Sequence, residues 1–183
     1  MDVYGVLRSI VDCEVELMRV WRNSPTVRMN MYSRHEISED EHRAWWARTM
    51  LSDRERYFMY ECLGVPTGIV AFQDIDRANE SAAWAFYADP HAVSGAGSRM
   101  EFLALEHAFN VMKLHKLHCE VFAFNRPVVR LHQKFGFQVE GTFREQRIVD
   151  GKRVDVIRLG MLSREWQSLR PQLKARIDQS LKG

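Results

Sequence analysis

Two glycines one residue apart, Gly95 and Gly97, lie in the stretch VSGAGSRME at the start of a long amphipathic segment. A glycine turn that leads into a helix presents free backbone N–H groups and the positive end of the helix dipole. Such groups bind anions, in particular phosphates. The pattern predicts an anion cradle built from the backbone of six residues, which are Val93, Ser94, Gly95, Ala96, Gly97 and Ser98. Taken alone, it also fits an ordinary glycine-rich turn.

Two residues that can move protons follow in the stretch HCEVFAFNRPVVRLHQKFGF. Glu120 has apolar neighbours in an expected strand, so its carboxylate is functional, paired, or partly solvated at a sheet edge. As a base, it would accept a proton from an attacking ammonium group. His132 lies on a short expected helix, and an imidazole with an ordinary pKa can donate a proton to a leaving group. The alternative is an exposed helix histidine, with water supplying that proton.

A third group of residues lies in the N-terminal half, in VWRNSPTVRMNMYSRHEISEDEHRAWW. His42 and Trp45 are three residues apart, so a cationic imidazole and a stacking surface share one helix face. Trp45 and Trp46 also fit plain core packing, and at least one is expected to be buried. Arg22, at the end of an expected helix, can bind a diphosphate through two guanidinium nitrogens. A surface salt bridge is the alternative for Arg22.

The elements that must position these residues follow from hydrophobic periodicity. The expected order is strand, helix, helix, three strands, helix, strand, helix and two strands, with a helical tail after them. Leu17, Val20 and Trp21 are expected on the buried face of the first helix. A turn at Val65-Pro66 is expected to join the second and third strands. The pattern predicts a mixed α/β sheet with helices packed on it.

Composition bounds the class of protein. With 183 residues, 46% of them hydrophobic, the chain is expected to form one well-buried domain. Lys+Arg 26 against Asp+Glu 24 is too balanced for a nucleic-acid binder, and no apolar stretch is long enough to span a bilayer. The N-terminus shows no signal-peptide pattern. Cys13, Cys62 and Cys119 fit neither a disulfide framework nor a zinc site, so we expect reduced thiols, no metal and a cytoplasmic location.

The glycine turn, its helix and the segment from Asn125 to Phe137 together resemble the GCN5-related N-acetyltransferase (GNAT) superfamily. The matching motifs are the two small positions of the turn, Asn125, and LHQKFGF, where His132 replaces a frequent tyrosine. The resemblance implies the acyl-CoA N-acyltransferase fold, an α/β fold with a mixed, mostly antiparallel seven-stranded sheet flanked by helices. It also implies acetyl-CoA as cosubstrate, held by the cradle and Asn125. Ala92 replaces the usual Gln or Arg of the motif.

The N-terminal segment resembles a narrower family, the UDP-aminosugar N-acetyltransferases of pseudaminic acid biosynthesis, which serve flagellin glycosylation. The signature is WRN, MYS and HxxW. It implies acetylation of the 4-amino group of a UDP-linked 4-amino-4,6-dideoxy-N-acetyl-hexose, by direct attack on the thioester. The roles implied are phosphate contacts for Arg22 and His42, a sugar or uracil wall of Met31, Tyr32 and Trp45, and Tyr87 beside the acceptor with an oxyanion-binding N–H nearby. Gln73-Asp74 departs from the usual Thr-Lys.

Three other interpretations remain. The closing segment EGTFREQRIVDGKRVDVIRLGML also resembles acetyltransferases of ribosomal-protein alanine and of polyamines. A CoA-binding regulator without turnover is the non-enzymatic alternative. We expect the acetyltransferase domain at residues 1–163, a helical tail at 164–183, and no acyl-enzyme, since no cysteine stands in a recognisable Cys/His/Asp arrangement. A homodimer is an oligomeric state that the sequence leaves open.

Overall fold

The computed structural model describes residues 4–180, which form a seven-stranded sheet with the order β1-β2-β3-β4-β5-β7-β6. All neighbouring strands pair antiparallel except β4 and β5, which pair parallel. The mixed, mostly antiparallel sheet predicted from the sequence is therefore confirmed. Its strands are β1 (Val6–Arg8), β2 (Arg56–Cys62), β3 (Val65–Asp76), β4 (Ser81–Ala88), β5 (Lys116–Phe122), β6 (Gln138–Val149) and β7 (Lys152–Leu162).

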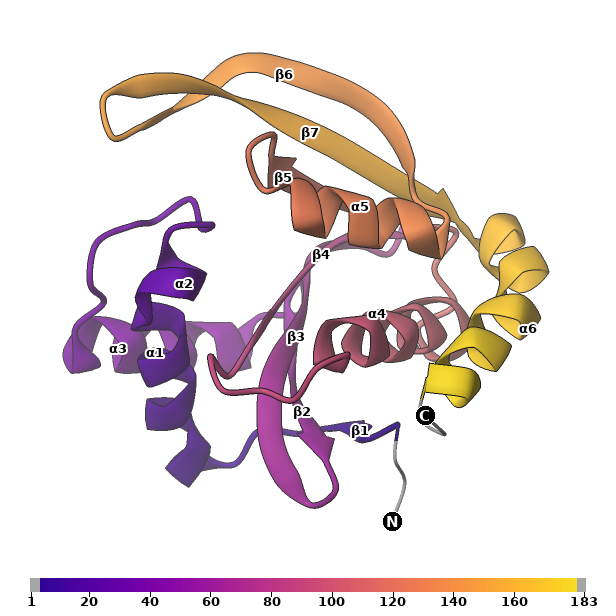
Figure 1. Cartoon of the computed structure of the whole chain (residues 1–183). Helices are drawn as coiled ribbons and strands as arrows, with labels where there is room; N and C mark the ends of the chain where they lie inside the picture. The colour runs from indigo at the N-terminus through magenta and orange to yellow at the C-terminus, as the bar shows by residue number, and fades with distance from the viewer. Residues whose placement is uncertain (1–3, 181–183) are drawn as a thin grey trace.

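Helices cover both faces of the sheet. In Figure 1, α1, α2 and α3 lie on one side of the central strands, and α4, α5 and α6 lie on the other. The helices are α1 (Val15–Asn23), which follows the short η1 (Asp12–Glu14), α2 (Pro25–Arg28), α3 (Glu39–Leu51), α4 (Ala96–Glu106), its π-helical continuation η2 (His107–Val111), α5 (Arg126–Phe135) and α6 (Ser163–Ser180). Within residues 4–180, no helix has both the length and the apolar character needed to cross a membrane.

Two hydrophobic clusters form because alternate strand residues point to opposite faces of the sheet. On β3, Val70 and Phe72 belong to the larger cluster, which also contains buried residues of α4 and α6, among them Trp166. Ile69 belongs to the smaller cluster, together with Met18 and Trp21 of α1. The helical tail after β7 is thus part of the main core, because α6 contributes fully buried Trp166 to it.

Two local predictions were wrong. Val20 is 52% exposed, and Met18 is buried in its place, because α1 begins at Val15 and its buried face is set by contact with β2 and β3. The β2–β3 turn is Leu63-Gly64 rather than Val65-Pro66, which belong to β3. Both turn residues have positive φ, as the two central residues of a type I′ turn require. This turn type matches the right-handed twist of the two strands that it joins.

The sheet opens between its two central strands. β4 and β5 pair only where Ser81–Ala83 lie beside Lys116–His118. Beyond that point β4 continues to Ala88 and β5 to Phe122 without pairing to each other. The open ends of both strands are therefore free to hold a ligand, and α4 begins shortly after β4 ends.

Candidate functional site

The glycine turn has the geometry of an anion cradle. Gly95 is the N-cap of α4 and has φ 82°, a left-handed conformation that glycine adopts without strain. The N–H of Ala96 donates to Val93 O at 3.2 Å. Within residues 4–180, the N–H groups of Gly97 and Ser98 donate to no backbone carbonyl, as is usual in a first helical turn. Two N–H groups and the helix dipole therefore face the opening.

Arg99 adds a positive charge that sequence reasoning missed. Its guanidinium Nη1 lies 3.2 Å from where a Cβ on Gly95 would stand, and its Nε donates to the Tyr60 hydroxyl at 3.0 Å. Arg99 is only 7% exposed. A cation at this position can compensate for Ala92, where the family motif has Gln or Arg. The only sign of Arg99 in the sequence was an arginine two residues after Gly97.

Asn125 lies at the other side of the opening. It caps the start of α5, its N–H donates to Phe122 O at 2.9 Å, and its carbonyl accepts from the N–H of Val129. Pro127 stands in the first turn of α5, and Gly136 ends the helix with φ 101°, which are the positions that these residue types favour. The cradle and Asn125 thus flank the gap between β4 and β5.

A cavity of about 630 Å³ lies on the α1–α3 side of the open strands. Every residue that the resemblance places near the acceptor lines this one cavity, and so does the candidate base Glu120, although the residues come from distant segments of the chain. The residues placed by the resemblance are Arg22, Met31, Tyr32, His42, Trp45 and Tyr87. His132, Asn125 and the glycine turn do not line it. The fold thus separates the glycine turn and Asn125 from the cavity on the α1–α3 side.

Arg22 lies in the cavity wall with a shielded guanidinium. Its Nη2 donates to the carbonyl and hydroxyl oxygens of Ser33, both at 2.8 Å. Its Nη1 is buried and has no hydrogen-bond partner. Among the described residues, no carboxylate forms an ion pair with it, so the salt-bridge interpretation is wrong. Burial lowers the pKa of Arg22, yet an arginine stays charged at neutral pH.

His42 and Trp45 share one face of α3, as the spacing predicts, with ring centroids 5.0 Å apart. His42 is 4% exposed, and burial, with Arg19 and Arg22 nearby, lowers its pKa. The expectation of a cationic His42 is therefore corrected: the ring is neutral near pH 7 and offers a hydrogen bond instead of a charge. Trp45 both lines the cavity and packs on the smaller cluster.

Glu120 lies on β5 beyond His118, the last residue of this strand that pairs with β4, so it stands at a locally open edge of the sheet, as the partly solvated alternative expects. Its carboxylate accepts from the Tyr32 hydroxyl at 2.7 Å and from Arg158 Nη1 at 3.1 Å. Desolvation and this hydrogen bond raise the pKa of Tyr32, so the phenol remains a donor. The Glu120 side chain is 32% exposed, which leaves it open to the cavity.

The segment after α2 is held over the cavity by the β6–β7 hairpin. Arg34 forms an ion pair with Asp150 at the hairpin turn, with 2.8 Å between Nη1 and Oδ1. Arg147 of β6 lies 4.2 Å from the ring centroid of Tyr32. Figure 1 shows the hairpin reaching across toward α2. These contacts join two parts of the chain that are far apart in sequence.

Tyr87 lines the cavity, but its own N–H points to β3. Asp89 N–H donates to Thr67 O at 2.9 Å, and Tyr87 faces Ile69 in the same register. In an antiparallel ladder, every second pair of facing residues exchanges hydrogen bonds. Thr67 and Asp89 form such a pair, so the pair two residues along is bonded too, and the N–H of Tyr87 donates to β3. The N–H groups of its neighbours Phe86 and Ala88 therefore point to the open side. The oxyanion-binding N–H expected near Tyr87 is one of these two.

His132 is buried, and the exposed-histidine interpretation is wrong. The residue is 2% exposed, and its Nδ1 lies 2.9 Å from Oε1 of Glu101, which is 0% exposed. Cys119 of β5 is near enough to the imidazole to influence its pKa. Only the fold brings α4, β5 and α5 together here.

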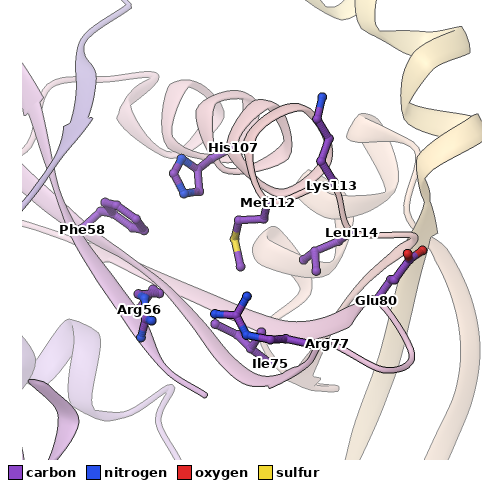
Figure 2. Close-up of a pocket in the computed structure, with 9 residues that line it drawn as sticks. All are labelled: Arg56, Phe58, Ile75, Arg77, Glu80, His107, Met112, Lys113 and Leu114. Atoms are coloured by element: carbon purple, nitrogen blue, oxygen red, sulfur yellow. The ribbon is translucent and has the colours of Figure 1, made fainter. Parts of the chain in front are cut away.

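A second cavity, of about 360 Å³, lies at the other end of the strands. Figure 2 shows the side chains that line this cavity. Arg56, Arg77 and Lys113 are exposed and carry positive charges, whereas Phe58, His107 and Met112 are partly buried. None of the predicted site residues lines it. Within the described residues, no group of three His, Cys, Asp or Glu side chains could hold a metal ion.

The fold and the site define an α/β protein with a glycine turn at a helix N-terminus beside an opened sheet. The chain belongs to the GNAT acetyltransferase family, because residues 6–138 match the family described as "Acetyltransferase (GNAT) domain".

Three relatives illustrate the range of the family. Spermidine N(1)-acetyltransferase of Escherichia coli is 27% identical over 113 residues, and the match spans only 61% of each chain. The acetyltransferase PseH of Campylobacter jejuni is 26% identical over 126 residues, 69% of this chain and 78% of that protein. The spermidine N-acetyltransferase structure from Vibrio cholerae, in complex with CoA and spermine, has a TM-score of 0.85 at 23% identity, covering 91% of this chain and 99% of that one. The last comparison shows the shared fold.

Proposed function

We propose that the protein is an acetyl-CoA-dependent N-acetyltransferase whose acceptor is a small amine that also carries an anionic group. The acceptor class that fits best is a UDP-linked 4-amino-4,6-dideoxy-N-acetyl-hexose. The glycine cradle and Arg99 bind the CoA pyrophosphate, and Asn125 borders the path of the pantetheine arm. The amine attacks the thioester carbonyl from the cavity side, and an N–H of Phe86 or Ala88 stabilises the oxyanion.

The observation that carries this proposal is the unpartnered, buried Nη1 of Arg22 in the cavity wall. A buried guanidinium nitrogen without a partner is costly, and a phosphate or carboxylate of the ligand would satisfy it. A polycation offers no such group.

Glu120 is the base of the proposed reaction. It lines the cavity and accepts hydrogen bonds from Tyr32 and Arg158, which hold its carboxylate in place. Its remaining solvent exposure allows a water to pass the ammonium proton to it. The amine must lose this proton before it can attack.

A polyamine is the second candidate acceptor. Carboxylates that line the same cavity favour it, in particular Glu41, Glu55 and Asp74. Glu55 and Asp74 lie near Tyr57. The E. coli and V. cholerae relatives named spermidine acetyltransferases also support this candidate.

The deciding experiment measures thiol release from acetyl-CoA with four acceptors in parallel: the UDP-linked aminosugar, spermidine, and peptides that begin with Ala or Ser. Release with the aminosugar alone is the expected result. Thiol release with spermidine alone would refute the UDP-aminosugar as the acceptor and favour a polyamine. If the protein binds CoA but releases no thiol with any of these amines, the result would favour a CoA-binding regulator without turnover.

Arg22→Ala is expected to raise KM for the UDP-aminosugar by about 10- to 100-fold, because one charge-assisted contact to the diphosphate is lost. KM for acetyl-CoA should change little, since Arg22 does not border the cradle. Steady-state kinetics with each substrate varied in turn measures both. Arg19→Ala is the matched control on the same helix, because Arg19 pairs with Glu16 outside the cavity. Equal KM values for variant and wild type would refute the phosphate role.

A further inference from the structure

The second cavity is separate from the site of the proposed reaction. It lies between the start of β2, the β3–β4 turn at residues 77–80 and the end of the helix formed by α4 and η2. It shares no lining residue with the cavity on the α1–α3 side. The glycine turn is at the opposite end of the same helix, about 20 Å away, because residues 96–111 rise by roughly 1.5 Å each. The volume of about 360 Å³ is in the range of small-molecule sites.

Apolar and aromatic side chains form the inner wall of this cavity. Ile75 and Leu114 are buried, and Phe58 and Met112 are half-buried. The Phe58 ring packs on the imidazole of His107, with ring centroids 4.5 Å apart. Burial lowers the pKa of His107, so the imidazole is neutral near pH 7 and adds to the uncharged wall. The wall is therefore suited to the apolar body of a ligand.

A π-helical turn positions part of this wall. In η2, the N–H of Met112 donates to His107 O at 2.8 Å, five residues back, so the turn holds one residue more than an α-helical turn. The extra residue rotates the side chains that follow by about 100° relative to a continuous α-helix. Figure 2 shows Met112 pointing into the cavity. Turns of this kind are rare and frequently occur at functional sites.

Positive charges without a protein partner surround the opening. Arg56, Arg77 and Lys113 are all exposed, and they come from β2, the β3–β4 turn and the segment after η2. Within residues 4–180, none of the three forms an ion pair. Nη1 of Arg56 donates to two backbone carbonyls, at 2.7 and 2.6 Å, which orients the guanidinium. Glu80 is the one carboxylate in the lining, so cations exceed anions there.

We propose that this cavity binds a small organic anion, whose carboxylate or phosphate contacts Arg56 and Arg77 and whose apolar body lies on Phe58 and Met112. Guanidinium groups bind both kinds of anion through two parallel N–H donors. Figure 2 shows both arginines on the sheet side of the cavity, whereas the amine of Lys113 points away from them. Lys113 therefore adds to the positive potential around the opening. Binding at this cavity goes beyond the proposed acetyl transfer and needs no acceptor amine.

The test titrates the full-length, isotope-labelled protein with phenyl phosphate and, in parallel, with benzoate, and follows the backbone amides by NMR. These probes carry a phosphate or a carboxylate on an aromatic ring. With at least one of them we expect saturable shifts at Arg77 and residues 112–114, and a dissociation constant below about 1 mM. Benzyl alcohol and inorganic phosphate each offer one of the two kinds of contact, so each should bind at least about 10-fold more weakly.

Arg77→Gln should weaken binding of the aromatic anion by about 10-fold or more, because a charge-assisted contact is lost. Arg54→Gln is the matched control, since Arg54 is also exposed, stands two residues before Arg56 and does not line the cavity. The control should bind like the wild type. Met112→Gln should weaken the aromatic anion but not inorganic phosphate, because it replaces an apolar contact. The amide spectra verify that each variant is folded.

Three results would overturn the proposal. The first is the absence of saturable shifts at the lining residues with both aromatic anions, including shifts confined to the glycine turn. The second is equal affinity for inorganic phosphate and the aromatic anions, which would show attraction to surface charge alone. The third is an equal loss of affinity in Arg77→Gln and Arg54→Gln. Because the readout is binding at named residues, a failure of the proposed acetyl transfer would leave it unchanged.

Discussion

Replacement of Gly97 by tryptophan should weaken acetyl-CoA binding by about 100-fold or more, equivalent to about 2.8 kcal/mol. A Cβ at Gly97 would point between α5 and β4, 3.5 Å from Leu131 Cδ2 and 3.7 Å from Phe86 Cε2. These are ordinary van der Waals distances, so a methyl group fits. An indole exceeds that space and must extend into the opening, where it covers the free N–H groups of Gly97 and Ser98.

Gly97→Ala is the matched control for this variant, since its methyl group meets the same two side chains without crowding them. Its affinity should stay within about 3-fold of wild type, less than 1 kcal/mol. Isothermal titration calorimetry with acetyl-CoA gives both dissociation constants, and thermal unfolding verifies that each variant is folded. Wild-type affinity in a folded Gly97→Trp protein would place the CoA site elsewhere.

His132→Phe should lower kcat by about 100- to 10,000-fold, the usual contribution of general acid catalysis, and leave acetyl-CoA affinity nearly unchanged. The phenyl ring fits among Trp84, Phe86 and Phe137 but has no proton to donate. Rapid-quench measurement of a single turnover isolates the chemical step from product release. Wild-type turnover in this variant would refute the acid role of His132.

Loss of His132 leaves the Glu101 carboxyl without its partner, which by itself destabilises a buried group. The double variant Glu101→Leu/His132→Phe removes this orphaned carboxyl and serves as the stability control. If the double variant recovers the unfolding temperature but not the turnover, the kinetic loss belongs to the proton donor. Recovery of both would assign the loss to folding alone.

Much of the secondary structure was predictable because it depends on local chemistry. Pro127 and Gly136 bound α5, and Asp150-Gly151 closes the last hairpin, since each residue type has few backbone conformations available. Ser38 caps α3 by accepting from the N–H of Glu41, as the capping-box spacing predicts. The carboxylate of Glu41, however, contacts His35, because a flexible side chain takes whichever donor the fold brings near.

The acceptor residues were nominated by resemblance, and only the fold brings them to one cavity. Tyr32 and Glu120 are 88 residues apart in sequence, yet they share a hydrogen bond because the hairpin holds the segment after α2 over β5. The charge of His42 was predicted incorrectly, since burial against α1 depends on tertiary packing that periodicity does not report. The i,i+4 spacing already brings Arg99 near Gly95, but its burial and its hydrogen bond to Tyr60 depend on how α4 packs on the sheet.

The sequence by itself determined the mixed sheet, the glycine turn before α4 and the order of the strands and helices apart from the short α2. Those features rest on short-range rules, which are turn chemistry and side-chain period. The GNAT family was identified by resemblance to its motifs, and the family match over residues 6–138 confirms it. Only the tertiary structure decided which groups are shielded from water and paired. Glu101 and His132 are 31 residues apart on two helices, and their 2.9 Å contact arises because α4 and α5 pack on the same face of the opened sheet. Burial and pairing set the chemistry of an ionisable group, and both are properties of packing between distant segments.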